Sequence, residues 1–274
     1  MALRFSKYEG LGNDFLIVEA TPDALTAAQV VALCDRHRGV GGDGVLFTGG
    51  DGPTMRVVNA DGSVPEMCGN GIRCVALHRI RSGHGSERDF DVATDAGPHH
   101  CRVLESGEHG LVEVTMRAAS LKPGDLPVVV GAAVDSLIDA PFEIGGRTLS
   151  LTAVSMGNPH AVVFDDVGDD RLELGPALQA DARFPQGVNV GFARQTDDGL
   201  VLDVLERGAG WTQACGTGAC AAAVAAVETG RARRGQPLQV RLPGGPLTIL
   251  VGDPAAPILM TGPARHVFDG TVEI

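Results

Sequence analysis

Two cysteines in this chain occur in nearly the same local sequence, and that setting favours proton chemistry at a thiol. Residues 68–76 read CGNGIRCVA and residues 215–223 read CGTGACAAA. In each block a Cys precedes a Gly-x-Gly turn that leads into a helical pattern. The first backbone N–H groups of a helix lack intrahelical partners, and the helix dipole is positive there, so the pKa of a thiol at this position falls from its usual value of about 8.5. Cys68 and Cys215 are therefore candidate acid-base residues.

Two matched thiols, separated by 147 residues, suggest a division of labour. One thiolate could remove a proton from one face of a carbon while the other thiol returns a proton to the opposite face, which is the two-base mechanism of a racemase or epimerase. The N–H groups at the same helix ends could bind a carboxylate and stabilise the developing carbanion. The pattern favours an isomerase acting next to a carboxylate.

Other interpretations of these blocks stay open on spacing alone. Glycine-rich helix starts also bind phosphates without thiol chemistry. A non-catalytic amino-acid-binding protein could use the helix ends to hold a carboxylate, although it has no use for two equivalent thiols. A cysteine hydrolase needs only one thiol. The remaining cysteines, Cys34, Cys74, Cys101 and Cys220, are expected to be small buried hydrophobes, and no pair has the CxxC spacing of a structural zinc or redox site.

Composition excludes several classes of protein. The chain has 274 residues, enough for one or two domains, and 44% of them are hydrophobic, which excludes general disorder. The net charge of −12 argues against nucleic acid as a partner. No apolar run approaches the length of a membrane span, about 18 residues, and the first residues do not resemble a secretory signal. We expect a soluble cytoplasmic protein that interacts with neither nucleic acid nor membrane.

The elements that must position the thiols are mostly short strands. Ten apolar or alternating runs separated by turn residues predict strands, with hairpins across residues 106–110, 145–146, 197–199 and 243–246, so the sheets should be largely antiparallel. Helical patterns cover about 24–38, 70–82, 169–182 and 217–229. The last helix is apolar on every side and is expected to be buried, with Gly230 ending it. The helix after Asn70 has Arg73, Arg79 and Arg81, which are expected to reach solvent.

Because the Cys-Gly-x-Gly block occurs twice, we expect two related halves. The segment LKPGDLP interrupts the strand pattern and marks the boundary near 117–125. The predicted domains are residues 1–118, carrying Cys68, and residues 119–263, carrying Cys215.

Six blocks of the chain resemble, in order, signature blocks of the diaminopimelate epimerase family. They are KYEGLGNDFLIVE (7–19), RVVNADGSVPEMCGNGIRC (56–74), SMGNPHAVVF (155–164), FPQGVNVGF (184–192), ERGAGWTQACGTGAC (206–220) and MTGPARHVFDG (260–270). This resemblance implies epimerisation of LL-2,6-diaminopimelate to meso-2,6-diaminopimelate in lysine biosynthesis, independent of pyridoxal phosphate, other cofactors and metals. It also implies a homodimer.

The resemblance assigns roles position by position. It identifies Cys68 and Cys215 as the proton donor and acceptor, and His160 and Glu206 as residues that tune the thiol pKa values. The residues implied to bind substrate are Asn13, Asn59, Gly69, Asn70, Asn158, Asn189, Glu206, Arg207, Gly216 and Thr217. Two positions depart from the family pattern: Gly44 replaces a substrate-contacting Gln found in many relatives, and Trp211 replaces a usual acidic residue.

The resemblance also implies an α/β fold of the α+β type. Two pseudo-symmetric halves, each a mostly antiparallel curled sheet around a central helix, would carry the active site in the cleft between them. Residues 264–274 would return to complete the first half. The nearest rival, a proline racemase or hydroxyproline epimerase, typically has a His where this chain has Asn70 and an Asp-rich approach to the second Cys.

Overall fold

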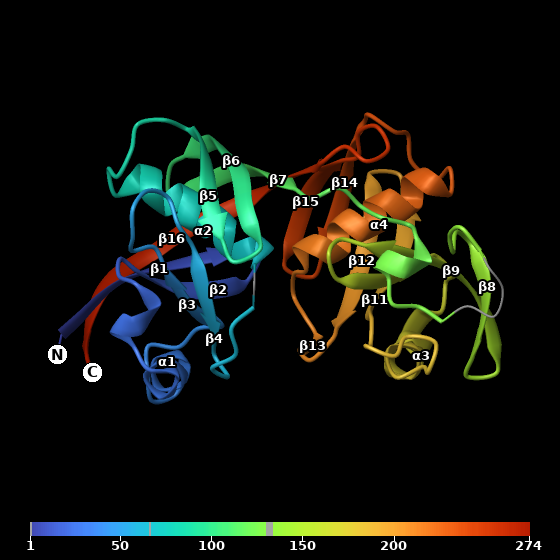
Figure 1. Ribbon diagram of the computed structural model, residues 1–274, viewed down its shortest axis with the longest axis horizontal. Helices are drawn as coiled ribbons and strands as arrows, with labels where there is room; N and C mark the ends of the chain where they lie inside the picture. Colours follow the sequence, from blue (N-terminus) through green and yellow to red (C-terminus); the bar gives the residue numbers. More distant parts are fainter. Residues whose placement is uncertain (1, 66, 130–133) are drawn as a thin grey trace. The chain divides into compact units, whose positions relative to one another are not determined.

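The chain folds into two compact units that are rich in strands (Figure 1). The structure is a computed structural model, which describes residues 2–65, 67–129 and 134–274. The first unit comprises Met1–Thr115 and Thr261–Ile274, and the second comprises Met116–Met260. The long last strand, β16 (Ile258–Glu273), therefore begins in the second unit and ends in the first.

The first unit is built on the N-terminal strands. Its strand order is β4 (Arg56–Asn59), β3 (Gly44–Phe47), β2 (Asn13–Val18), β1 (Ala2–Gly10) and β16, and β16 also pairs with β7 (His109–Met116), followed by β6 (Gly97–Ser106) and β5 (Asp89–Thr94). β1 is antiparallel to both β2 and β16, whereas β2 and β3 run parallel. The C-terminal residues thus complete the first sheet, with Ala2 opposite Glu273.

The second unit has a comparable sheet. Its strand order is β8 (Ala140–Ile144), β9 (Arg147–Ser155), β10 (Pro159–Val163), β11 (Asn189–Thr196), β12 (Gly199–Glu206), β14 (Pro237–Leu242) and β15 (Gly245–Leu250), with β13 (Gly210–Trp211) paired to β12. β10 is parallel to β11 and β12 is parallel to β14, and the other registered pairs of this unit are antiparallel. All four predicted hairpins form, so the prediction of largely antiparallel sheets is confirmed.

The second unit surrounds α4 (Gly216–Glu228), whose side chains are small enough for strands to approach on several sides. The residues from Ala219 to Ala226 are at most 4% exposed, and the helix contacts β9, β10, β11, β12, β14 and β15. Gly230 follows the helix at φ 73°, and the Arg231 N–H donates to the Ala226 carbonyl, as in a Schellman motif. The predictions of a buried helix and of its C-terminal stop are confirmed.

The first unit surrounds α2 (Gly69–Arg81), which contacts β1, β2 and β6. The expectation that Arg73 reaches solvent is wrong, because its side chain is fully buried. Its guanidinium donates to the carbonyl oxygens of Gly69 and Pro263 and to the side-chain oxygen of Asn70. Burial of this cation is tolerated because its N–H groups find acceptors. Arg73 thereby links the start of α2 to β16.

The remaining helices are short. They are α1 (Ala27–Cys34), α3 (Arg171–Gln179) and the 3₁₀ turns η1 (Pro22–Ala24), η2 (Pro123–Asp125) and η3 (Gly168–Asp170). The first predicted helix, 24–38, ends early because the Asp35 side chain accepts from the N–H groups of His37 and Arg38, which stabilises a turn there. None of the helices in the described ranges has the length and hydrophobicity needed to span a bilayer.

Candidate active site

In the first unit, Cys68 is the N-cap residue of α2. Its backbone is extended, with φ −133° and ψ 111°, and its sulfur accepts a hydrogen bond from the Gly71 N–H at 3.3 Å. The thiol therefore occupies the position in which a capping oxygen is usual, beside the unpaired amides of the first turn. A helix start with Gly69 and Gly71 lets the backbone amides face outward next to the sulfur. Cys68 is partly exposed, so a small molecule can reach it.

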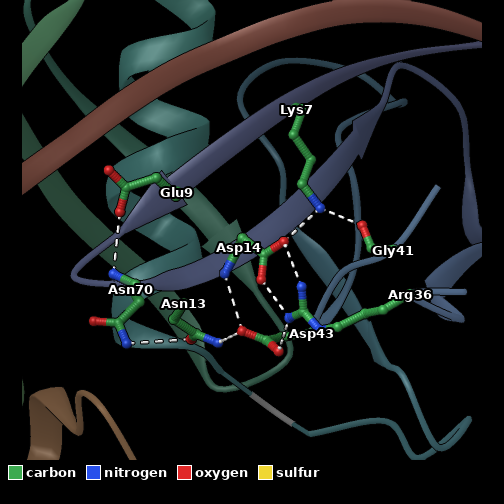
Figure 2. Close-up of polar contacts among 9 residues, drawn as sticks. Lys7, Glu9, Asn13, Asp14, Arg36, Gly41, Asp43 and Asn70 are labelled. Atoms are coloured by element: carbon green, nitrogen blue, oxygen red, sulfur yellow. Dashed lines mark hydrogen bonds and ion pairs between the residues drawn. The ribbon is translucent and has the colours of Figure 1, made fainter. Parts of the chain in front are cut away.

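A chain of polar contacts connects this helix start to the neighbouring strands (Figure 2). The Asn70 amide donates to the side-chain oxygen of Asn13 at 3.2 Å, and the Asn13 amide donates to Asp43 at 2.5 Å. Asp43 also accepts from the Asp14 N–H at 3.0 Å and forms an ion pair with Arg36 at 2.7 Å. The structure thus brings Asn13 and Asn70 together, and Asp43 fixes the orientation of the Asn13 amide.

Asn59 lies at the end of β4. Its amide donates to the Ser63 hydroxyl at 2.9 Å, and its backbone is opposite Gly44 in β3. A β-carbon at position 44 would lie 2.7 Å from the Val58 carbonyl oxygen. β3 and β4 are therefore packed closely at Gly44, where a side chain would meet the backbone of Val58.

In the second unit, Cys215 is the N-cap residue of α4, with nearly the same backbone conformation as Cys68. Its φ is −126° and its ψ is 105°, and its sulfur accepts from the Gly218 N–H at 3.4 Å. The Thr217 hydroxyl lies 3.6 Å from the sulfur. Unlike Cys68, Cys215 is buried, with 4% of its surface exposed.

Two of the expected substrate contacts, Asn158 and Thr217, lie beside this helix start, together with His160, which was expected to tune a thiol pKa. The Asn158 side-chain amide donates to the Thr217 hydroxyl at 3.5 Å, and the Asn158 side-chain oxygen Oδ1 lies 3.1 Å from His160 Nε2. His160 is itself 1% exposed. A neutral imidazole can donate through Nε2 and hold the Asn158 amide toward Thr217.

The other expected contacts come from β11 and from the end of β12. The Asn189 side-chain oxygen Oδ1 accepts from the Arg207 backbone N–H at 2.8 Å, while the Arg207 guanidinium donates to the Gln186 backbone carbonyl at 2.6 Å. The Thr212 hydroxyl donates to the Glu206 carboxylate at 2.5 Å. These bonds hold the Glu206 carboxylate and the Arg207 guanidinium, which belong to consecutive residues at the end of β12.

Two titratable groups near the start of α4, Cys215 and His160, have shifted pKa values. Burial raises the pKa of the Cys215 thiol well above its usual value, and the Glu206 carboxylate raises it further. Burial lowers the pKa of His160 to about 3, with a smaller contribution from Arg207. In the unliganded protein Cys215 is therefore a neutral thiol and His160 a neutral imidazole at physiological pH.

Similarity to known proteins covers the whole chain. The diaminopimelate epimerase family model matches residues 5–122 and 152–267. The diaminopimelate epimerase of Synechococcus elongatus is 45% identical over 284 residues, which cover 100% of this chain and 99% of the relative. The relative from Desulforudis audaxviator is 44% identical over 279 residues, with 98% of each chain covered. The chain belongs to the diaminopimelate epimerase family.

Solved structures agree with the fold of a diaminopimelate epimerase. A Bacillus anthracis phenazine biosynthesis protein of the PhzF family superposes with a TM-score of 0.70 at 15% identity, covering 100% of both chains. A hydroxyproline epimerase of Agrobacterium vitis superposes with a TM-score of 0.65 at 17% identity, covering 99% of this chain and 92% of that one. At these identities the likeness concerns the fold alone. It confirms the expected α/β fold with two sheet-rich halves.

Trp211 stands four residues before Cys215, where the family resemblance predicts an acidic residue. It lies in β13 opposite Leu205, and its ring packs 6.2 Å from the ring of Phe192. The indole is 39% exposed and also contacts the backbone region of Gly175. Part of the Trp211 ring thus packs against its own unit and part is exposed. Trp211 carries no charge, and Glu206 is the carboxylate that raises the pKa of the Cys215 thiol.

Sequence reasoning overlooked two residues of this diaminopimelate epimerase family member that hold site side chains in place. Asp43 lies in the glycine-rich segment 39–47, directly before Gly44. Thr212 lies between Glu206 and Cys215, inside the block 206–220. The available signal was a polar residue inside a signature block for Thr212 and a charged residue in a glycine-rich segment for Asp43, but only the tertiary structure shows which partner each one contacts.

Proposed function

We propose that this chain interconverts LL- and meso-2,6-diaminopimelate, using Cys68 and Cys215 as the two acid-base groups. A thiolate removes the α-proton from one face of the carbon, and the other thiol donates a proton to the opposite face. In the reverse reaction the two thiols exchange roles. Because one sulfur gains a proton while the other loses one, the complex of enzyme and substrate gains or loses no proton. The reaction needs no cofactor, because the proton moves between the thiols and substrate and because helix-end N–H groups can stabilise the carbanion.

The observation that carries this proposal is the equivalence of the two thiols. Both are N-cap residues of 13-residue helices, and both sulfurs accept from the N–H group three residues later. A hydrolase or a simple binding protein requires no such pair. Membership of the diaminopimelate epimerase family, with 45% identity over the full chain, agrees with the assignment.

The two thiols differ in the unliganded state, and we propose that the difference sets the starting protonation. Cys215 is buried beside Glu206, which raises its pKa, so it starts as the thiol that donates a proton. Cys68 is more exposed and starts as the base. A substrate that covers Cys68 changes its surroundings, so the catalytic pKa values belong to the thiol pair in the complex.

We further propose that the polar residues of each half-site recognise the zwitterionic substrate. The N–H groups of Gly69, Asn70, Gly216 and Thr217 are suited to the reacting carboxylate, because they lie at helix N-termini. The amides of Asn13, Asn59, Asn158 and Asn189, together with Glu206 and Arg207, offer partners for ammonium and carboxylate groups.

Hydrogen exchange tests the proposed reaction directly. The purified protein is incubated with LL-diaminopimelate in D₂O, and the stereoisomers and their deuterium content are measured by chiral chromatography and mass spectrometry. We expect meso-diaminopimelate that carries deuterium at the inverted α-carbon. Proline and hydroxyproline are the matched control substrates. If proline or hydroxyproline is isomerised while diaminopimelate takes up no deuterium, the substrate assignment is wrong. If none of the three compounds takes up deuterium, the enzyme assignment is wrong.

We propose a homodimer that works in the cytoplasm, and the structure offers one surface for its contact. Val267 and Phe268, which are consecutive in β16, are 45% and 44% exposed.

In analytical ultracentrifugation the wild type is expected to sediment as a dimer and Phe268→Asp as a monomer. Leu172→Asp, at a 52% exposed position in α3, is the control and should remain dimeric. A monomeric wild type contradicts the homodimer, and a dimeric Phe268→Asp contradicts this surface.

A further inference from the structure

Two histidines and one glutamate of the first unit meet outside the residues assigned to catalysis. Glu19 directly follows β2, His78 lies in the last turns of α2, and His84 follows the end of that helix. The Nε2 atoms of His78 and His84 each lie 2.9 Å from the same Glu19 carboxylate oxygen, Oε1. All three ligand atoms lie within 4.8 Å of one another. The mechanism proposed above uses none of these side chains.

Two of the three separations, those from the histidine nitrogens to the Glu19 oxygen, are close to the separations in a metal site, and the two nitrogens lie within 4.8 Å of each other. A zinc ion with bonds of about 2.0–2.1 Å in a tetrahedral arrangement keeps its ligand atoms about 3.3 Å apart. The two 2.9 Å separations would have to lengthen by only a few tenths of an ångström. Two imidazoles and one carboxylate form a donor set that zinc commonly uses when its fourth ligand is water.

The backbone holds two of the ligands in place. His78 is 5% exposed, so its ring is packed in the core. His84 follows Gly83, which has φ 78°, and the His84 N–H donates to the Arg79 carbonyl at 3.1 Å while the Gly83 N–H donates to Ile80. This is a Schellman motif, which fixes the chain just after the helix. The negative end of the α2 dipole also lies beside the cluster and favours a cation.

The hydrogen-bond partner of the second ring nitrogen of His78 also supports a metal site. His78 Nδ1 lies 3.4 Å from the Tyr8 hydroxyl, and the two rings meet edge to face with centroids 5.4 Å apart. When Nε2 binds a metal, the imidazole proton lies on Nδ1, and metal-bound histidines usually donate it to an oxygen. The Tyr8 hydroxyl is positioned to accept that proton.

The cluster opens into a cavity of about 420 Å³, which Thr48, Gly49 and Thr54 also line. The cavity leaves room for a water ligand and gives an ion a path of entry. Arg79 lines it as well, with its guanidinium stacked 5.2 Å from the centroid of the Phe90 ring. That positive charge reduces the affinity for a cation, so the site should bind more weakly than a cage with two or more anionic ligands.

We propose that Glu19, His78 and His84 form a binding site for a divalent transition-metal ion, with zinc as the favoured ion. The ion replaces the two hydrogen bonds to Glu19 with coordinate bonds and joins the end of β2 to the end of α2. The site lies within the first unit, and its occupancy does not depend on the proposed epimerase activity.

The test is metal titration of the full chain after treatment with a chelator. Zn²⁺ binding is measured by competition with a chromophoric chelator, and Co²⁺ is used as a spectroscopic probe of the ligands. We expect one ion per chain, a Co²⁺ spectrum with nitrogen and oxygen ligands and no thiolate charge-transfer band, and a higher Tm with Zn²⁺. His84→Ala and Glu19→Gln should each weaken binding about a hundredfold, since each removes a direct ligand.

His109→Ala is the matched control, because His109 is an exposed histidine of the same unit outside the cluster. It should bind zinc like the wild type. Both ligand variants replace partly exposed side chains, and circular dichroism without metal verifies that they are folded. Unchanged affinity in His84→Ala and Glu19→Gln would overturn the proposal, as would a thiolate band in the Co²⁺ spectrum or the absence of binding to the wild type.

Discussion

At the scale of single residues, the helix N-cap position supports the proposed proton exchange at the two cysteines. Each sulfur accepts one backbone N–H at 3.3–3.4 Å, which stabilises its anionic form. Burial acts in the opposite direction, and at Cys215 burial dominates. The two effects together leave one site ready to donate a proton and show why equivalent sequences need not have equal pKa values.

Single-thiol variants test whether each cysteine serves one face of the substrate. Cys68→Ala and Cys215→Ala should each lose epimerisation by about a thousandfold or more, because one of the two proton transfers loses its group. The remaining thiol can still exchange the hydrogen on its own face without inversion. Deuterium should therefore enter only one stereoisomer in Cys68→Ala and only the other in Cys215→Ala. Exchange into both stereoisomers by either variant would contradict the two-face assignment.

His160 should make the fold sensitive to acid. Its pKa is lowered to about 3 in the folded protein, whereas an unfolded histidine titrates near 6.5. Between these values the unfolded chain binds a proton that the folded chain does not, so the free energy of unfolding falls as the pH drops, by up to about 1.4 kcal/mol per pH unit. This contribution is constant above about pH 6.5.

Urea unfolding at several pH values between 4 and 7 measures that slope. His160→Gln should unfold with a shallower pH dependence, because glutamine takes up no proton. His109→Gln, which changes an exposed histidine, should keep the wild-type slope. Equal slopes in all three proteins would show that His160 is not responsible.

At the scale of elements, the two central helices are equivalent from end to end. α2 and α4 each contain 13 residues, begin after a cysteine N-cap and end in a Schellman motif, at Gly83 and Gly230. They differ in their side chains: α4 is lined by alanines, whereas α2 buries Arg73 and His78. The same backbone element therefore packs closely in one unit and carries internal polar contacts in the other.

Overpacking of α4 tests the tight fit of its strands. Ala222 is fully buried at the centre of the helix, so Ala222→Leu inserts three carbons where no space exists. We expect a loss of about 1–3 kcal/mol in the free energy of unfolding, measured by urea denaturation. The control, Ala28→Leu in α1, lies on an exposed face and should change stability little. Equal effects of the two variants would contradict tight packing around α4.

At the scale of the whole molecule, the first unit is discontinuous in sequence. β1 is paired on one side with β2 and on the other with residues near the C-terminus, from Glu9 opposite Arg265 to Ala2 opposite Glu273. This unit therefore cannot complete its sheet until the last residues of the chain are available. Such long-range pairing raises the contact order and slows folding.

Truncation and permutation test this dependence. Deletion of residues 261–274 removes the partner strand of β1, and we expect the first unit to lose its cooperative unfolding transition in calorimetry. A circular permutant that places residues 261–274 ahead of residue 1, through a short Gly-rich linker, should recover it, since Glu273 and Ala2 are paired neighbours. Normal unfolding of the truncated chain would show that the C-terminal strand is dispensable.

The features that depend on local patterns could be predicted from the order of the amino acids. The repeated Cys-Gly-x-Gly block, the apolar helix and the glycine turns specify backbone conformation within a few residues, so the helix starts, the hairpins and the end of α4 were predictable. Strands such as β3 and β5 were not predicted, because their short patterns gain stability only from the strands beside them. The family blocks identified the residues of the proposed site.

The contacts between distant side chains, and the exposure of those side chains to water, could be read only from the folded chain. Arg73 was expected at the surface, but the acceptors that allow its burial come from Gly69, Asn70 and Pro263, the last of them 190 residues away. The Cys215 thiol and the Cys68 thiol occupy matching sequences, yet only burial beside Glu206 distinguishes the first. Burial and electrostatic interactions depend on distance in space, which spacing along the chain does not determine.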